Sequence, residues 1–151
     1  MTNKDLANVI FPNITKTIEE KEKMYPERDL PEGACVTRYA PSPTGFMHLG
    51  GLFQALIDYV VAKESNGIFY LRNEDTDKTR EIEGAVELIM QVLNEYNLTP
   101  DEYEYEGKTV GNYGPYIQSE RKEIYHAFIK HLIEIGRAYP CFCSTEELAE
   151  M

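Results

Sequence analysis

A helical repeat of apolar residues runs from residue 49 to residue 61. Its members lie three or four positions apart, which is the spacing of one face of an amphipathic α-helix. They are Leu49, Leu52, Phe53, Leu56, Ile57, Val60 and Val61. Residues 34–40 before the helix have strand propensity, and the mostly apolar residues 68–72 after it are typical of a buried strand. Such a unit almost always joins two parallel strands by a right-handed crossover, so the sequence predicts an α/β fold.

Proline, glycine and further apolar spacing predict the rest of the chain. Pro41 must end the first strand because proline cannot donate to a sheet. A second helical face follows, made by Ile82, Ala85, Val86, Ile89, Leu93 and Tyr96. Residues 101–117 are rich in tyrosine and glycine, and we expect a surface loop there. A third helix is expected to begin near Ser119, a good N-cap residue, and to end at Gly136.

The two ends of the chain carry their own helix signals. Residues 1–33 are expected to be a short helical extension, in which Thr17 and Glu20 have the spacing of a capping box. Proline-rich turn chemistry closes that extension between residues 25 and 33. A new helix is expected to begin at Ser144, close to the last residue. The sequence therefore predicts a chain that stops inside a larger domain.

Charge excludes one class of function. The chain has 26 acidic and 15 basic residues and a net charge of -11. Binding nucleic acid through bulk charge requires a basic surface, so this class is excluded, although a local basic patch remains open. No apolar run reaches the length of a membrane span, and the first residues do not resemble a signal peptide. With three cysteines and no secretion signal, we expect a reduced, cytoplasmic setting.

The loop after the first strand is the strongest candidate for a ligand site. It lies at the carboxyl end of a strand and opens a helix, whose N-terminal N–H groups favour anions. His48, Gly50 and Gly51 occupy the first turn of this helix. The histidine can donate to a phosphate, and the glycines allow a ligand to approach the backbone closely. A glycine-tolerant helix end with a surface histidine is the equally weighted alternative.

Three motifs resemble those of the glutamyl-tRNA synthetase family, which are class I aminoacyl-tRNA synthetases. They are residues 38–51 (RYAPSPTGFMHLGG), residues 71–77 (LRNEDTD) and residues 114–121 (GPYIQSER). The first is similar to that family's form of the "HIGH" motif. Gly51 replaces a histidine of this motif, and Asn73 stands where an apolar residue is usual. The lysine-bearing "KMSKS" loop of the family lies beyond residue 151.

The resemblance implies a division of the chain. Residues 1–33 are similar to the N-terminal extension of one bacterial subgroup. Residues 34–140 are expected to form the first half of a Rossmann-like domain that binds ATP and an amino acid. Residues 141–151 are expected to begin a connective insertion. The implied substrates are L-glutamate, ATP with Mg²⁺, and tRNA, which would be bound mostly by regions outside this chain.

The resemblance also implies roles for individual residues. His48, Gly50 and Gly51 would form the catalytic turn, and Pro41 and Thr44 would join His48 and Gly50 in binding ATP. Arg38, Ser42 and Glu74 would bind glutamate, with the guanidinium gripping a carboxylate. Arg72 and Asp77 would orient the substrate-binding side chains without contacting the substrate themselves. Residue by residue, a structural alternative remains: Arg38 as a surface charge at a strand end, and Glu74, Asp75 and Asp77 as caps of the following helix.

Cys141 and Cys143 could form half of a zinc site. Separated by one residue on an extended segment, their thiols point the same way. Some family members have a similar Cys-x-Cys pair with further ligands downstream, whereas a structural zinc site normally needs four. Two reduced structural cysteines are the alternative. His126 and His131 are expected to be ordinary surface or boundary residues. The tyrosines are expected to serve in packing, at positions 96, 103, 105, 113 and 116.

Two further functions stay open at this point. A short synthetase that glutamylates a modified tRNA base (glutamyl-queuosine type) shares the motifs and the cysteine pair. A non-catalytic half-domain that binds a nucleotide or a partner is the alternative from another class, and the net charge of -11 suits it better than autonomous tRNA binding. In either case we expect the isolated chain to lack aminoacylation activity, and its unpaired sheet edge to favour self-association.

Overall fold

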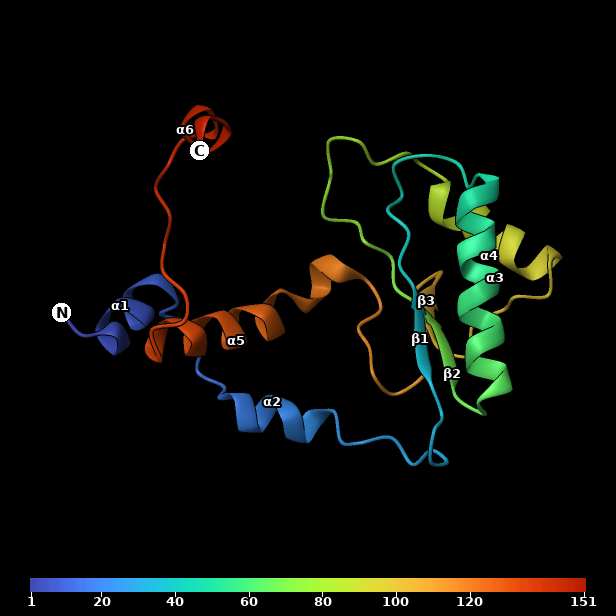
Figure 1. The fold of residues 1–151 in the computed structure, drawn as a ribbon, viewed down its shortest axis with the longest axis horizontal. Coiled ribbons are helices and arrows are strands. Elements are labelled where there is room, and N and C mark those ends of the chain that lie inside the picture. The colour runs from blue at the N-terminus through green and yellow to red at the C-terminus, as the bar shows by residue number, and fades with distance from the viewer. The chain divides into compact units, whose positions relative to one another are not determined.

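Two parallel strands and the helix between them form the frame of the structure, as the sequence predicts. In the computed structural model, which describes residues 1–151, β1 (Val36–Tyr39) pairs in parallel with β2 (Ile68–Leu71). Val36 lies opposite Ile68, and Tyr39 lies opposite Leu71. The crossover helix is α3 (Leu49–Glu64), which packs on both strands (Figure 1). The predicted end of the first strand before Pro41 is confirmed.

The chain divides into two compact units. The central unit is continuous and contains residues 25–122, whereas the terminal unit combines residues 1–24 with residues 123–151. The core of the central unit lies between α3, the two strands and α4 (Ala85–Glu95). Its buried apolar members are Tyr39, Ala55, Ala62, Phe69, Leu71, Ile89, Met90, Leu93 and Leu98.

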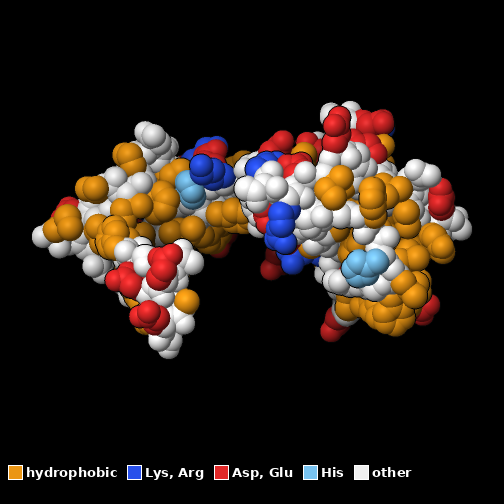
Figure 2. Space-filling model, turned by 90° about the horizontal axis from the view of Figure 1, so that it is seen from above, with side chains coloured by type: hydrophobic (Ala, Val, Ile, Leu, Met, Phe, Trp, Pro, Cys, Tyr) orange, Lys and Arg blue, Asp and Glu red, His pale blue; other side chains and the backbone are white.

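The apolar stripe of α3 is exposed, although an amphipathic helix normally packs its apolar face against a core. The residues of α3 that are buried are Ala55 and Ala62, and Leu52 and Tyr59 pack beside them. The longer side chains of the repeat are between 42% and 81% exposed; they are Leu49, Phe53, Leu56, Ile57, Val60 and Val61. Figure 2 shows hydrophobic side chains gathered on the surface of the unit that carries α3. A helix that is apolar on more than one side is typical of a larger core than these elements provide.

Residues 101–117 are not the surface loop that the sequence predicts. β3 (Tyr103–Tyr105) and β4 (Lys108–Val110) form an antiparallel hairpin within them. Its two-residue turn is Glu106–Gly107, with φ of 50° and 70°. Both residues are left-handed, as a type I′ hairpin turn requires. The segments on either side of the hairpin continue the sheet, because Glu102 bridges to Tyr70 and Ile117 bridges to Asn73, both in parallel.

Two helices of the terminal unit, α2 and α6, begin at the predicted capping residues. This unit contains α1 (Asn3–Ile10), α2 (Ile18–Met24), most of α5 (Lys122–Glu134) and α6 (Thr145–Glu150). Thr17 and Glu20 form the capping box of α2, and Ser144 caps α6 in the same way. Lys21 of α2 is 3% exposed and forms an ion pair with Glu123 of α5. None of the helices has the length and apolar character needed to cross a membrane.

Ser119 does not cap α5 as predicted. It lies inside a 3-10 turn, η1 (Gln118–Arg121), in the central unit just before α5. Its hydroxyl donates to the Asp75 carboxylate at 2.6 Å, and its backbone N–H donates to the same carboxylate at 2.8 Å. The side chain that satisfies this turn therefore comes from a distant segment, which local sequence cannot reveal.

Candidate functional site

The loop between β1 and α3 encloses a cavity of about 490 Å³. The loop leaves the sheet at the carboxyl end of β1, where open α/β sheets bind ligands. Its lining comes from the end of β1, the loop, the first turns of α3 and one residue of α4. These residues are Tyr39, Ala40, Pro41, Ser42, Thr44, Gly45, Phe46, Met47, His48, Gly50, Gly51, Gln54 and Ile89. The predicted ATP-binding residues thus share one concave surface.

His48 is the N-cap of α3, and its own side chain satisfies the free N–H groups of the helix. Nδ1 accepts hydrogen bonds from the backbone N–H of Gly50 at 3.1 Å and of Gly51 at 3.4 Å. Because Nδ1 is an acceptor, the proton of the neutral ring resides on Nε2. The sequence left both nitrogens open as donors toward an anion. The structure leaves Nε2–H as the donor of this ring.

Gly51 has a packing reason that the sequence did not reveal. A Cβ at this position would lie 2.9 Å from Tyr39 Oη, so a side chain here would force the Tyr39 hydroxyl or the helix turn to shift. A Cβ at Gly50 would lie 3.0 Å from Cε1 of the capping His48 ring. Both glycines therefore let the first turn of α3 settle against its neighbours. A ligand at this turn would meet backbone and the His48 ring rather than a wall of side chains.

Two arginines converge on Glu74 at the carboxyl ends of the strands. Arg72 donates to Glu74 Oε1 at 3.0 Å, and Arg38 Nη1 lies 3.8 Å from the same oxygen. Arg72 and Glu74 are partly buried, whereas the Arg38 side chain is 40% exposed. One carboxylate between two guanidinium groups leaves an excess positive charge, which suits a further carboxylate. The structure thus brings together Arg38 and Glu74, which the resemblance assigns to glutamate, with Arg72, which it assigns to orienting the site.

The cavity and the arginine–glutamate cluster meet at Pro41. The backbone N–H of Glu74 donates to the Pro41 carbonyl at 3.0 Å, while the N–H of Arg72 donates to the Tyr39 carbonyl at 3.0 Å. Successive residues of a strand point to opposite faces, so Arg38 and Tyr39 leave β1 on opposite sides. Ser42 lines the cavity together with Pro41 and forms no hydrogen bond with the cluster. The arrangement places the cavity directly beside the charged cluster.

Asp75 and Asp77 lie after this cluster and have local partners. Asp75 is 4% exposed and accepts from Ser119 and from Lys78 Nζ at 2.7 Å. Burial alone would raise the pKa of Asp75, but the hydrogen bonds from Lys78 and Ser119 outweigh it and hold this pKa below its ordinary value. Asp77 accepts from Thr79 and Arg80 within its own loop, and these bonds lower its pKa. Neither carboxylate caps α4, whose N-cap is Gly84.

Two polar residues of α3 were missed by sequence reasoning. Gln54 lines the cavity, one helical turn after Gly50, so the spacing from the glycine pair is the signal that could have found it. Asp58 follows one turn later, and its Oδ2 is buried without a hydrogen-bond partner. Burial raises the pKa of Asp58, while the positive charge of Arg38 opposes the rise. Burial likewise raises the pKa of the neighbouring Tyr39.

Cys141 and Cys143 do not complete a metal site in this chain. Both thiols are exposed, and no group of three or more His, Cys, Asp or Glu side chains is placed to hold a metal ion. Hydrogen bonds from Cys143 lower the pKa of the Cys141 thiol. Two thiols are half of the donor set that a structural zinc needs, so the residues present do not fit zinc by themselves.

Comparison with known proteins gives the family. The family described as "tRNA synthetases class I (E and Q), catalytic domain" matches residues 34–151. The chain belongs to this family. The matched range contains β1, the cavity loop, α3, and the arginine–glutamate cluster after β2. Its parallel α/β core is therefore part of a class I catalytic domain.

The similar proteins are glutamate–tRNA ligases. The chain is 55% identical to a glutamate–tRNA ligase of Acetivibrio thermocellus, over 100% of this chain and 28% of that protein. It is 52% identical to a glutamate–tRNA ligase of Clostridium perfringens, over 98% of this chain and 27% of that protein. A solved glutamate tRNA ligase from Elizabethkingia meningosepticum, in complex with its amino acid, matches with a TM-score of 0.69 and 44% identity. That match covers 79% of this chain and 23% of the solved chain.

Proposed function

We propose that the chain is the first half of the ATP- and amino-acid-binding domain of a glutamate–tRNA ligase. The single observation that carries this proposal is the pairing of two subsites at the strand ends. A cavity at the N-terminus of α3 adjoins a cluster with two guanidinium groups and one carboxylate. The family match and the names of the relatives support the same reading.

The proposed reaction has two steps. The α-carboxylate of glutamate attacks the α-phosphate of ATP, forming glutamyl-adenylate and releasing pyrophosphate. A terminal ribose hydroxyl of tRNA then attacks the activated carbonyl, forming the ester and releasing AMP. Such transfers need positioning and charge stabilisation more than a covalent enzyme intermediate. The side chains of the cavity and the cluster are of that kind, because they are donors and charges rather than nucleophiles.

The arginine–glutamate cluster would hold the amino acid. Arg38 is the more exposed of the two arginines, and its 3.8 Å distance from Glu74 leaves its guanidinium available to a substrate carboxylate. Arg72, held at 3.0 Å, would keep Glu74 in place for the substrate ammonium. Ser42 would add a hydroxyl from the cavity side. This set selects a substrate with two carboxylates and one amine.

The cavity would hold ATP. The Nε2–H of His48 would donate to a phosphate oxygen, since its Nδ1 is engaged by the helix N–H groups. Gly50 would present backbone to the nucleotide, and Pro41 and Thr44 would shape the wall. Mg²⁺ would be bound mainly through phosphate oxygens and water, where it neutralises charge on the phosphates. The tRNA would be bound mostly by parts of the longer protein.

Replacing Arg38 tests this function in the complete protein that carries the chain. The ATP–pyrophosphate exchange assay gives KM for glutamate and for ATP separately. Losing charge-assisted hydrogen bonds of about 1.5–3 kcal/mol predicts a glutamate KM for Arg38→Ala that is raised about 10- to 100-fold. The ATP KM should stay within about twofold, because Arg38 does not line the cavity.

Arg137→Ala is the matched control, because Arg137 is an exposed arginine of the terminal unit that lies outside the cavity and the cluster. Its kinetics should equal those of the wild type. An unchanged glutamate KM in Arg38→Ala would refute the assigned role. A wild-type protein with no glutamate-dependent exchange would refute the proposed function.

A further inference from the structure

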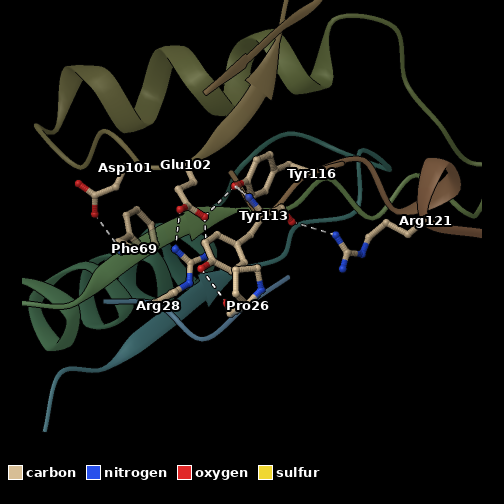
Figure 3. A network of polar contacts seen from close by, with 8 residues as sticks. All are labelled: Pro26, Arg28, Phe69, Asp101, Glu102, Tyr113, Tyr116 and Arg121. Atoms are coloured by element: carbon tan, nitrogen blue, oxygen red, sulfur yellow. Dashed lines mark hydrogen bonds and ion pairs between the residues drawn. The ribbon is translucent and has the colours of Figure 1, made fainter. Parts of the chain in front are cut away.

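A buried ion pair joins Arg28, in the segment before β1, to Glu102, in the segment that pairs with β2. Arg28 donates two hydrogen bonds to the Glu102 carboxylate, at 2.5 and 2.6 Å (Figure 3). The side chains are 16% and 9% exposed. This bidentate geometry is the strongest that an arginine and a carboxylate form. Glu102 raises the pKa of Arg28, mainly through its hydrogen bonds.

Aromatic side chains enclose the pair. The Arg28 guanidinium lies 3.7 Å from the centre of the Tyr113 ring, and Tyr113 Oη donates to the Pro26 carbonyl at 2.8 Å. Tyr116 is 2% exposed, and its hydroxyl donates to Glu102 at 2.7 Å (Figure 3). A Cβ at Gly111 would lie 2.5 Å from that hydroxyl, so the chain is folded tightly around it.

The same network borders the end of β2. The N–H of Leu71 donates to the Glu102 carbonyl at 2.9 Å, and the N–H of Asn73 donates to the Tyr116 carbonyl at 2.9 Å. The Asn73 carbonyl in turn accepts from Gln118 at 2.9 Å. Glu102 and Tyr116 therefore hold the backbone on both sides of Arg72. Glu74, which Arg72 contacts, is the next residue after Asn73.

A buried ion pair is a poor choice where only stability is needed. Removing two charges from water is unfavourable, and well-packed apolar residues of the same volume often give equal or greater stability. What a bidentate pair adds is a fixed geometry, because the planar guanidinium accepts few arrangements. In this chain the pair fixes Glu102, whose backbone carbonyl accepts a hydrogen bond from Leu71, directly before Arg72.

We propose that Arg28 is a positioning residue for the amino-acid subsite, acting through Glu102 and Tyr116 on residues 72–74. Residues 25–33 before β1, which we call the strap, thus fix the geometry of the arginine–glutamate cluster. This inference rests on the proposed function, since it concerns the glutamate subsite. It predicts that loosening the strap disturbs glutamate binding more than ATP binding.

Kinetics of Arg28 variants in the complete protein test this. In ATP–pyrophosphate exchange, Arg28→Ala should raise the glutamate KM about tenfold and the ATP KM by less than about threefold. Arg28→Lys keeps the charge but loses the bidentate geometry, so its glutamate KM should lie between those of the wild type and Arg28→Ala. Tyr116→Phe should raise the glutamate KM as well. The Arg28→Ala/Tyr116→Phe double variant should show less than the product of the single effects, because both act through one network.

Matched controls separate positioning from stability. Asp29→Ala changes an exposed neighbour of Arg28 and should leave both KM values unchanged. Ile133→Ala removes a buried side chain of the terminal unit, and should lower Tm without changing the ratio of the two KM values. If Arg28→Ala does not fold, Arg28→Lys and Tyr116→Phe carry the same comparison. Equal changes in the two KM values, or a loss of Tm alone, would overturn the inference.

Hydrogen exchange gives a readout that does not depend on the proposed function. The Asn73 and Gln118 amides should exchange faster in Arg28→Ala than in the wild type, whereas amides in the middle of α3 should not change. Unchanged exchange at Asn73 and Gln118 would show that the strap does not reach the strand end, and would refute the inference. A protein with the exchange change but no glutamate-dependent activity would refute the proposed function and the subsite role together.

Discussion

Gly67 joins α3 to β2, and its lack of a side chain lets β2 begin beside β1. The Gly67 N–H donates to the Ala62 carbonyl at 2.8 Å, and the next N–H, of Ile68, donates to the Cys35 carbonyl at 3.1 Å. A Cβ at residue 67 would lie 1.8 Å from the Cys35 carbonyl oxygen and 2.7 Å from its carbon. These are backbone atoms, so no rotamer change can relieve the clash.

The structure gives the size of the effect of Gly67→Ala. To reach even 3.0 Å, the added Cβ and the Cys35 carbonyl oxygen must separate by about 1.2 Å more. That separation moves the start of β2 away from β1. That displacement breaks the Ile68–Cys35 hydrogen bond, worth about 0.5–1.5 kcal/mol. Overpacking adds about 1–3 kcal/mol. We therefore expect a loss of about 2–4 kcal/mol in the free energy of unfolding, or roughly 5–15 °C in Tm.

Thermal unfolding followed by circular dichroism measures this shift. Gly45→Ala is the matched control, because a Cβ at residue 45 meets no atom within 4 Å. Gly45→Ala should change stability by less than about 1 kcal/mol. Equal Tm values for the two variants would show that β2 can move freely relative to β1, and would refute the close-packing argument.

Two further predictions concern the Asp75 carboxylate and the exposed stripe of α3. Because the folded pKa of Asp75 lies below its unfolded value, its stabilisation is present above about pH 4 and is lost as pH falls through the folded pKa. Asp75→Asn should thus be less stable by about 1–3 kcal/mol at pH 7 in urea unfolding, with a gap that closes below pH 4; a gap independent of pH would contradict this. The 151-residue chain alone should self-associate through the stripe and the free edge of β1. Light scattering should show a mass that rises with concentration, less so in Phe53→Gln, and a monomer at every concentration would refute it.

Features with local causes could be predicted from sequence. The apolar repeat located α3, the prolines located the end of β1, and the capping residues Thr17 and Ser144 located α2 and α6. Each depends on residues within one or two turns of each other. The β3–β4 hairpin also had a local signal, because Tyr103 and Tyr105 alternate with acidic residues before a turn ending in Gly107. Tyrosine and glycine content alone does not distinguish such a hairpin from a surface loop.

Features with distant causes could not be predicted. The motif residues of the site were identified by resemblance, but only the coordinates bring Arg38, Arg72 and Glu74 together or place His48 Nδ1 on the helix N–H groups. The Arg28–Glu102 pair joins residues 74 positions apart. No spacing rule relates such residues. The burial of Ala55 in place of the larger residues of α3 likewise depends on what packs against the helix.

The order of segments has a consequence for how the chain folds. The terminal unit is assembled from both ends of the sequence, so contacts such as Lys21–Glu123 span 102 positions. Closing a flexible loop of that length carries an entropic cost of roughly 4 kcal/mol. The central unit is continuous and its parallel strands are joined by one crossover. Kinetically, the central unit is expected to be the nucleus, and α2 and α5 to meet only after it has formed.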